Sequence, residues 1–362
     1  MADPIRRLAR CAAAIAAIAI AVASPACRQG DARPPLLEGA EPAPGIGGGS
    51  TVGGAGDAGD PDGAGATVFV ETGAPPTAVA VDANAVYFAM GTADPSADAG
   101  VFPAGSIVRV PRAGGVAAPI VTGAVRPTRI LVSGAALVFV DDDPRGGRVL
   151  GVSLDAGTVT PLATGFASPS AIASDGAYVY IASSSGGTGV QVDRVNLAGG
   201  QQPSPVATIA GDLDPRGLAI AGATAVFVAA EQVGGSVLTA PSAGGPAETI
   251  GAILTGDLGD VAIAGADAFV ASGGAAGSIV RVPLARGTPS PLASGEADPA
   301  AITVDGDNVY WLRRGTGELV RAPAAGGDPV VLASGLDGAR ALAVGAAWTY
   351  VATSHAIVRA PK

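Results

Sequence analysis

Carboxylates are the side chains of this sequence whose spacing suggests chemistry at a site. Asp141, Asp142 and Asp143 stand in a row, and Asp260 precedes an apolar run further along the chain. Because Ca²⁺ is bound by oxygen ligands, these four aspartates are the candidate metal ligands. Calcium loops place their acids at alternate positions, unlike this run, and Pro144 follows it, so a solvated turn is the competing interpretation.

The sequence lacks the residues that other common catalytic and binding sites require. His355 is the only histidine, which excludes a multi-histidine metal site and leaves a Ser-His-Asp arrangement no other base. The chain has no Gly-x-x-x-x-Gly-Lys-Ser/Thr phosphate loop, and no catalytic or cofactor-binding residue is predicted; Ca²⁺ is the one ion left open. The formal net charge is −10 and no segment is strongly basic, which excludes nucleic acid as a partner.

The N-terminus carries the pattern of an export signal. Arg6, Arg7 and Arg10 precede an apolar run over residues 11–23. As a helix this run would span about 20 Å, which is too short for the ~30 Å hydrocarbon core of a bilayer. Residues 1–26 are therefore predicted to be a cleaved signal peptide.

Cys27 is the candidate site of lipidation. The four residues that end at Cys27, SPAC, resemble a bacterial lipoprotein signal, although Ser24 stands where Leu is usual. Cleavage at the A-x-A sequence of residues 21–23 is the alternative. Residues 27–65 are rich in Gly, Ala and Pro and are predicted to be a flexible tether. We expect an exported protein of the periplasm or outer cell surface, anchored by lipid.

An internal repeat fills the rest of the chain and predicts its fold. The clearest copy, residues 299–335, contains Val-Asp-Gly, Val-Tyr-Trp, Val-Arg-x-Pro and Gly-Gly in that order. The innermost strands of the copies are predicted to begin near Pro76, Pro127, Pro169, Pro215, Gly259, Pro299 and Gly338. Four short antiparallel strands at a period of about 40–45 residues are typical of a propeller blade.

The two ends of the repeat region complement each other. Residues 67–73 match an outer strand that has no inner strands before it, and the last copy stops at Lys362 after its third strand. We expect the N-terminal strand to complete the last blade, because that closure removes open sheet edges. The prediction for residues 66–362 is an all-β, seven-bladed β-propeller of four-stranded antiparallel blades.

The repeat motifs resemble the NHL and YWTD types of exported bacterial propeller. The resemblance covers residues 67–362 and implies the fold. Leu312 and Arg313 depart from the YWTD motif, so receptor-type ligand binding is not implied. Families of this kind include binding platforms, assembly partners and a few enzymes.

Charged residues gather on the loops of one predicted face. Its basic residues are Arg126, Arg145, Arg216, Arg313, Arg314 and Arg340. Mixed charge around a central funnel suits a polar ligand. The long loop of residues 89–105 lies on the same face and contains Met90, Asp94, Asp98 and Phe102. Long loops on rigid scaffolds often contain the residues that recognise a partner. The alternative is an insertion that has no function.

The predicted function is a non-enzymatic binding or scaffold propeller at the cell envelope. Its partner would be an unknown protein, or a polar small molecule or glycan. The alternative is a metal-dependent hydrolase of the gluconolactonase-like type, whose members hold an ion on the axis with Glu, Asp and Asn. The starts of the inner strands offer mostly Ala, Thr, Ser, Gly and Arg, with Asp260 as the main exception, which favours the first interpretation. We expect a monomer that meets the membrane only through its N-terminal lipid.

Overall fold

The computed structural model describes residues 65–91, 102–185, 189–200, 202–253 and 255–362. By its contacts the chain divides into residues 1–48 and 49–362, and all described residues belong to the second unit. The described residues form strands, turns and loops without a helix. Across this part of the chain, nothing has the length and apolar character of a membrane-crossing helix.

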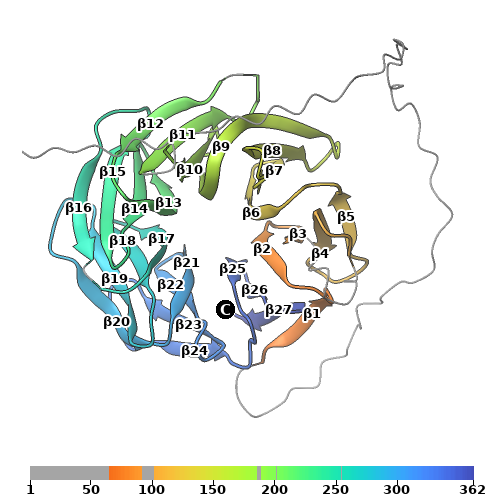
Figure 1. Cartoon of the computed structure of the whole chain (residues 1–362). Helices are drawn as coiled ribbons and strands as arrows, with labels where there is room; N and C mark the ends of the chain where they lie inside the picture. Colours follow the sequence, from red (N-terminus) through yellow and green to blue (C-terminus); the bar gives the residue numbers. More distant parts are fainter. Residues whose placement is uncertain (1–64, 92–101, 186–188, 201, 254) are drawn as a thin grey trace, which may run out of the picture. The chain divides into compact units, whose positions relative to one another are not determined.

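Four of the sheets are antiparallel and contain four strands that follow one another in sequence (Figure 1). The first contains β2 (Pro76–Val81), β3 (Ala85–Met90), β4 (Ser106–Pro111) and β5 (Ala118–Val121). The second contains β13 (Asp214–Ala221), β14 (Thr224–Ala230), β15 (Gly235–Pro241) and β16 (Glu248–Ile253). The third contains β17 (Leu258–Ala264), β18 (Asp267–Ser272), β19 (Gly277–Pro283) and β20 (Ser290–Glu296). The fourth contains β21 (Pro299–Asp305), β22 (Asn308–Arg313), β23 (Glu318–Pro323) and β24 (Val330–Ala333).

A fifth four-stranded sheet joins the first strand of the described chain to the last, as predicted. Its order is β1-β27-β26-β25. The strands are β1 (Thr67–Glu71), β25 (Ala341–Val344), β26 (Trp348–Ala352) and β27 (Ala356–Pro361). Thr67 pairs with Arg359 and Glu71 with Ala356. The ring edge that β27 would otherwise expose is therefore covered by β1.

The remaining sheet has seven strands, in the order β12-β11-β10-β9-β8-β7-β6. The strands are β6 (Pro127–Ser133), β7 (Ala136–Asp141), β8 (Gly147–Ser153), β9 (Val159–Ser174), β10 (Tyr178–Ser184), β11 (Val190–Asn196) and β12 (Ser204–Ile209). Residues 159–166 of β9 pair with β8, and residues 167–174 pair with β10. Hydrogen bonding between strands thus forms six sheets, whereas the sequence predicted seven separate blades. The numbers differ because β9 continues unbroken from one group of strands to the next.

The innermost strands pack side by side around an axis within the unit of residues 49–362 (Figure 1). Contacts run from β2 to β6, β9, β13, β17, β21, β25 and back to β2. Five of these strands, β2, β6, β13, β17 and β21, carry a β-bulge near their start, and β9 carries one between residues 167 and 171, where it begins to pair with β10. A bulge bends its strand and re-aims the side chains beside it. The bulges therefore determine which side chains face the axis.

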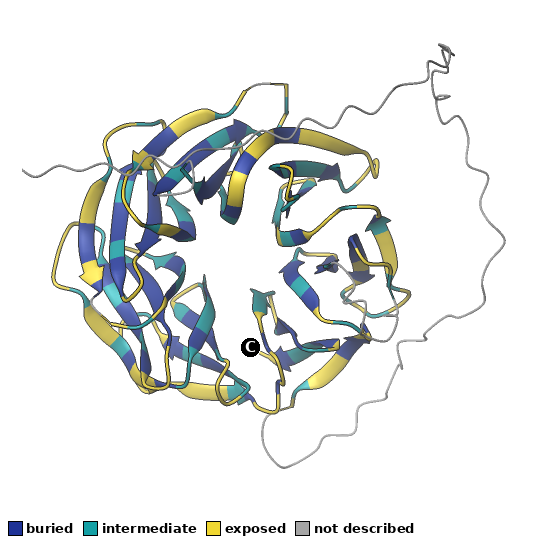
Figure 2. Ribbon diagram, in the orientation of Figure 1, coloured by how far each residue is buried: buried dark blue, intermediate teal, exposed yellow. Residues whose placement is uncertain are grey.

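The core lies between neighbouring sheets. Figure 2 shows that middle strands such as β3, β14 and β18 are buried along most of their length, while outer strands carry exposed segments. Aromatic and arginine residues that recur in the repeat face each other across the two middle strands, as in Tyr87–Arg109 and Tyr180–Arg194. The Tyr87 hydroxyl donates to Asp82 Oδ2 at 2.9 Å, and burial, with the Asp82 carboxylate, raises the pKa of Tyr87 to about 12.

Candidate functional site

The axis holds a cavity of about 400 Å³ lined by residues of every innermost strand. This volume is in the range of small-molecule sites. Its charged residues are Arg129, Arg216, Asp257, Asp260, Arg314 and Arg340. Four cations against two carboxylates give the lining an excess of positive charge, although the chain as a whole is acidic.

Two of the cavity arginines are held by carboxylates. Arg216 Nη2 lies 3.6 Å from Asp214 Oδ2 and 3.5 Å from Asp257 Oδ1. Arg314 Nε lies 3.1 Å from Asp298 Oδ2. These pairs orient the two guanidinium groups and neutralise part of their charge.

The other two cavity arginines are held by backbone carbonyls. Arg129 Nε donates to the Ser170 carbonyl at 2.8 Å, and Arg340 Nε donates to the Gly338 carbonyl at 3.1 Å. Among the described residues neither makes an ion pair. Burial lowers the pKa of Arg340, but a guanidinium stays charged in proteins. Two fixed positive charges thus face the cavity without an anionic partner.

Asp260 is one of the two carboxylates in the cavity lining. It lies on β17, and desolvation by burial raises its pKa, while the Arg129 charge acts in the opposite direction. The described residues supply it with no ion-pair partner within 4.0 Å. Asp260 is half-buried, and no side-chain hydrogen bond reaches its carboxylate from the described residues, so at the cavity wall this carboxylate is available to a ligand donor.

Asp141, Asp142 and Asp143, the other candidate metal ligands, each have a partner in the protein. The Asp141 carboxylate is fully buried, pairs with Arg148 and accepts the Arg126 backbone N–H at 2.6 Å. Asp142 pairs with the Arg126 side chain. Asp143 Oδ1 accepts a backbone N–H two residues further on, at 2.9 Å. None of the three lines the axial cavity, so the structure does not bring them together with Asp260.

Metal-ligating side chains do not gather elsewhere in the described part of the chain. No group of three or more His, Cys, Asp or Glu residues there has a geometry that could hold an ion. His355 is at the surface, where its Nδ1 lies 2.7 Å from the Ser354 hydroxyl. Cys27, the candidate lipidation site, lies outside the described residues and stays a prediction.

The candidate recognition loop divides between described and undescribed residues. Met90 is 2% exposed at the end of β3, and Phe102 packs against Phe88 with ring centroids 5.4 Å apart. Met90 and Phe102 are thus packed in the core between the first and last sheets. Asp94 and Asp98 lie outside the described residues, so for them the predicted recognition role stays a prediction.

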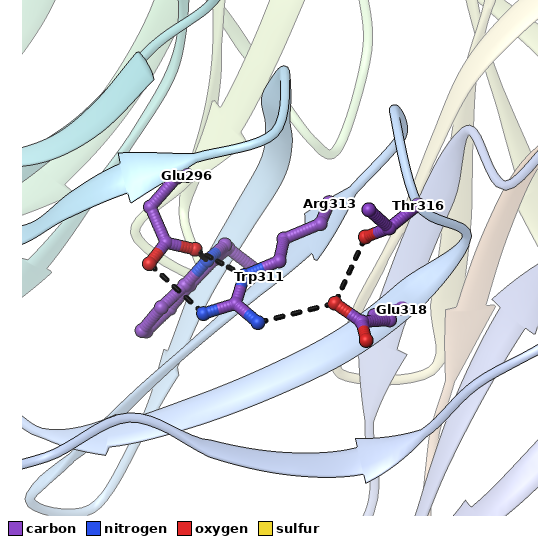
Figure 3. A network of polar contacts seen from close by, with 5 residues as sticks. All are labelled: Glu296, Trp311, Arg313, Thr316 and Glu318. Carbon is purple, nitrogen blue, oxygen red and sulfur yellow. Dashed lines mark hydrogen bonds and ion pairs between the residues drawn. The ribbon is translucent and has the colours of Figure 1, made fainter. Parts of the chain in front are cut away.

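Arg313, placed on the charged face by its sequence position, belongs to a polar network instead of the cavity. Figure 3 shows its guanidinium between two carboxylates. Glu296 is 1% exposed and accepts from Arg313 Nε at 2.6 Å, from Arg313 Nη2 at 3.0 Å and from Trp311 Nε1 at 2.7 Å. Glu318 accepts from Arg313 Nη1 at 3.1 Å and from the Thr316 hydroxyl at 2.8 Å. The hydrogen bonds of Glu296 raise the pKa of Arg313, and the network ties β20 to β22.

Sequence reasoning identified Arg216, Arg314, Arg340 and Asp260 but missed Arg129 and Asp257. The signal that would have found Arg129 is its place in the repeat. Arg129 is the second residue after Pro127, as Asp260 is the second after Leu258, and both strand starts belong to the same repeat position. Aligning every inner strand on that position shows which residues lie at one level of the cavity.

The fold resembles those of several proteins of known structure. No family model and no curated protein matches the chain. The selenomethionine-substituted virginiamycin B lyase from Staphylococcus aureus matches with a TM-score of 0.65 at 11% identity, over 82% of this chain and 98% of the lyase. Hydrazine synthase from Kuenenia stuttgartiensis matches with a TM-score of 0.58 at 16% identity, over 79% of this chain and 94% of that one.

A computationally designed protein, Ika8, matches with a TM-score of 0.55 at 13% identity, over 81% of this chain and 98% of its own. Identities this low show the fold alone. The chain therefore has a β-propeller repeat fold, which the sequence predicted. Proteins named as enzymes occur among the structures that share it, so fold does not decide function.

Proposed function

We propose that this propeller is a non-enzymatic binding protein of the cell envelope that captures a small molecule with an anionic group in its axial cavity. The observation that carries the proposal is the set of four cavity arginines, of which Arg129 and Arg340 face the cavity without an anionic partner among the described residues. A guanidinium is planar, permanently charged and matched to carboxylate or phosphate. The cavity volume suits a small molecule better than a protein segment.

The ring is proposed to have seven blades. The seven-stranded sheet would count as two blades that share β9, the first ending at residue 166 and the second beginning at residue 167. Support comes from the pairing of β9 with both β8 and β10, and from the closed order of contacts among the inner strands. Each blade would then contribute one inner strand to the cavity wall.

Anion binding is expected to depend on the cavity arginines. Titrating residues 49–362 with glutarate or inorganic phosphate at low ionic strength should give saturable binding by calorimetry. The double variant Arg129→Gln/Arg340→Gln should weaken glutarate binding at least tenfold, because a hydrogen bond to a charged group contributes about 1.5–3 kcal/mol. Arg145→Gln/Arg286→Gln removes the same charge outside the cavity and should leave the Kd unchanged. Equal weakening in both double variants, or no binding of either anion, would contradict the proposal.

The protein is proposed to be exported as a monomer and held at the envelope through a lipid on Cys27. The basis is the basic N-terminal segment, the short apolar run and the cysteine that follows it. In a bacterial host, the parent protein is expected in the detergent phase of a phase-partitioning extraction and to incorporate labelled fatty acid. Cys27→Ser should move it to the aqueous phase without changing its Tm. A parent protein found only in the aqueous phase would rule out the anchor.

A further inference from the structure

One level of the axial cavity carries a single positive and a single negative residue on opposite walls. Arg129 on β6 and Asp260 on β17 both lie at the bulge of their strand, directly before an apolar residue. Along the ring of contacts, β9 and β13 separate the two strands on one side, and β21, β25 and β2 on the other. The two side chains therefore start from opposite sides of the cavity.

The space between them is left open by small residues. The corresponding positions of the other inner strands are Ala78, Ala171, Ala301 and Ala341, which line the cavity, and Gly217, which does not. None of these side chains reaches far into the cavity or offers a polar group. Arg129 and Asp260 both line the cavity, but they form no ion pair with each other. The two opposite charges therefore remain available to a ligand from opposite walls.

A ligand would complete this arrangement if it carried both charges. A carboxylate can take two parallel hydrogen bonds from the Arg129 guanidinium. A protonated amine at the other end of the molecule would give Asp260 the donors that the protein does not supply. A dicarboxylate would still be held by the arginines, but its second charge would approach the Asp260 carboxylate, so it should bind less tightly than the zwitterion. A purely cationic ligand would meet the four arginines of the lining.

We propose that the ligand of the axial cavity is a small zwitterion of the amino acid type, whose carboxylate binds Arg129 and whose ammonium group binds Asp260. The inference rests on the proposed function, because it names the class of ligand that this same cavity takes. Asp260 then serves as the specificity residue that separates zwitterions from simple acids, and Arg129 as the anchor that both classes share.

Three probes of one chain length test the inference: 5-aminopentanoate, pentanoate and pentylamine, titrated calorimetrically into the full chain. The zwitterion is expected to bind at least tenfold more tightly than pentanoate, and pentylamine to show no saturable binding. Asp260→Asn should remove the difference between the two acids, and Arg129→Gln should weaken both. Asp328→Asn, at an exposed turn outside the cavity, is the matched control and should change neither Kd.

The outcomes separate this inference from the proposed function. Equal binding of 5-aminopentanoate and pentanoate, both weakened by Arg129→Gln, would overturn the zwitterion and leave anion binding intact. Binding that Arg129→Gln does not change, or no binding of any probe, would overturn both. Because Asp260→Asn removes a desolvated charge, its Tm should equal or exceed that of the parent protein, so a loss of selectivity cannot be put down to unfolding.

Discussion

Removing residues 65–73, which include β1, is expected to abolish the cooperative unfolding transition of the propeller. Phe69 and Val70 of β1 are buried, and Phe69 packs edge-on against Tyr350 with centroids 5.4 Å apart. Losing both side chains removes about 5 kcal/mol or more of stabilisation, which is comparable to the whole stability of a typical domain. The deletion also exposes the unpaired edge of β27 to aggregation.

Circular dichroism during heating, with size-exclusion chromatography, measures this effect. Two point variants on the same strand separate packing from strand pairing. Phe69→Ala should destabilise the protein by about 3–5 kcal/mol, while Val68→Ala, at a side chain that is 54% exposed, should cost less than about 1 kcal/mol. A truncated chain that melts at the parent temperature as a monomer would show that the ring does not need β1.

Glu296→Gln is expected to lower the free energy of unfolding by about 3 kcal/mol. The substitution removes the charge that pairs with Arg313, whose guanidinium is only 21% exposed, and leaves that cation without its two-pronged acceptor. Breaking one partner of a buried ion pair typically costs about 3–5 kcal/mol, and the remaining contact with Glu318 offsets part of the loss. The corresponding decrease in Tm is roughly 5 °C.

Urea unfolding of a double-mutant cycle tests the network. Trp311→Phe removes the second donor to Glu296, so its cost and that of Glu296→Gln should not add. Glu248→Gln is the control, because Glu248 pairs with Arg286 at an exposed site where such pairs contribute about 0–1 kcal/mol. If the two glutamate variants are equally stable, the Glu296 network is not a stabilising element.

The sequence predicted how the strands are arranged better than it predicted where each strand begins and ends. The match of residues 67–73 to an outer strand was enough to predict that β1 joins the last sheet, because the missing strand and the unmatched strand are complementary. The continuity of β9 was not predictable in the same way. Gly165 and Pro169 indicate a break between two strands, yet Gly165 has φ +88° inside β9 and the chain pairs on both sides of it. That continuity depends on pairing with β8 on one side and with β10 on the other, which the residue types within β9 do not reveal.

The sequence predicted only part of the candidate site, because the rest of the site depends on how the strands are arranged in the fold. Residue type identified Asp260 and three of the cavity arginines, but not the facing pair of Arg129 and Asp260, since only the closed ring places their strands opposite each other. The sequence also did not reveal the ion pair of Asp141, because Arg148 lies on the next strand, across a turn from Asp141. Local sequence shows which residues are charged, and the tertiary fold decides which of those charges remain available to a ligand.

The pairing of β1 with β27 also affects how the chain matures during synthesis. The Arg359 Nε and Thr67 Oγ1 atoms that meet at this junction belong to residues 292 positions apart. The ring consequently cannot close until β27 has been made, and until then Phe69 lacks the Tyr350 ring that packs against it. A chain without β27 keeps the edge of β1 open, and open strand edges and exposed apolar surface make folding intermediates prone to aggregation. The pairing of the first described strand therefore waits for the synthesis of a strand 292 residues later.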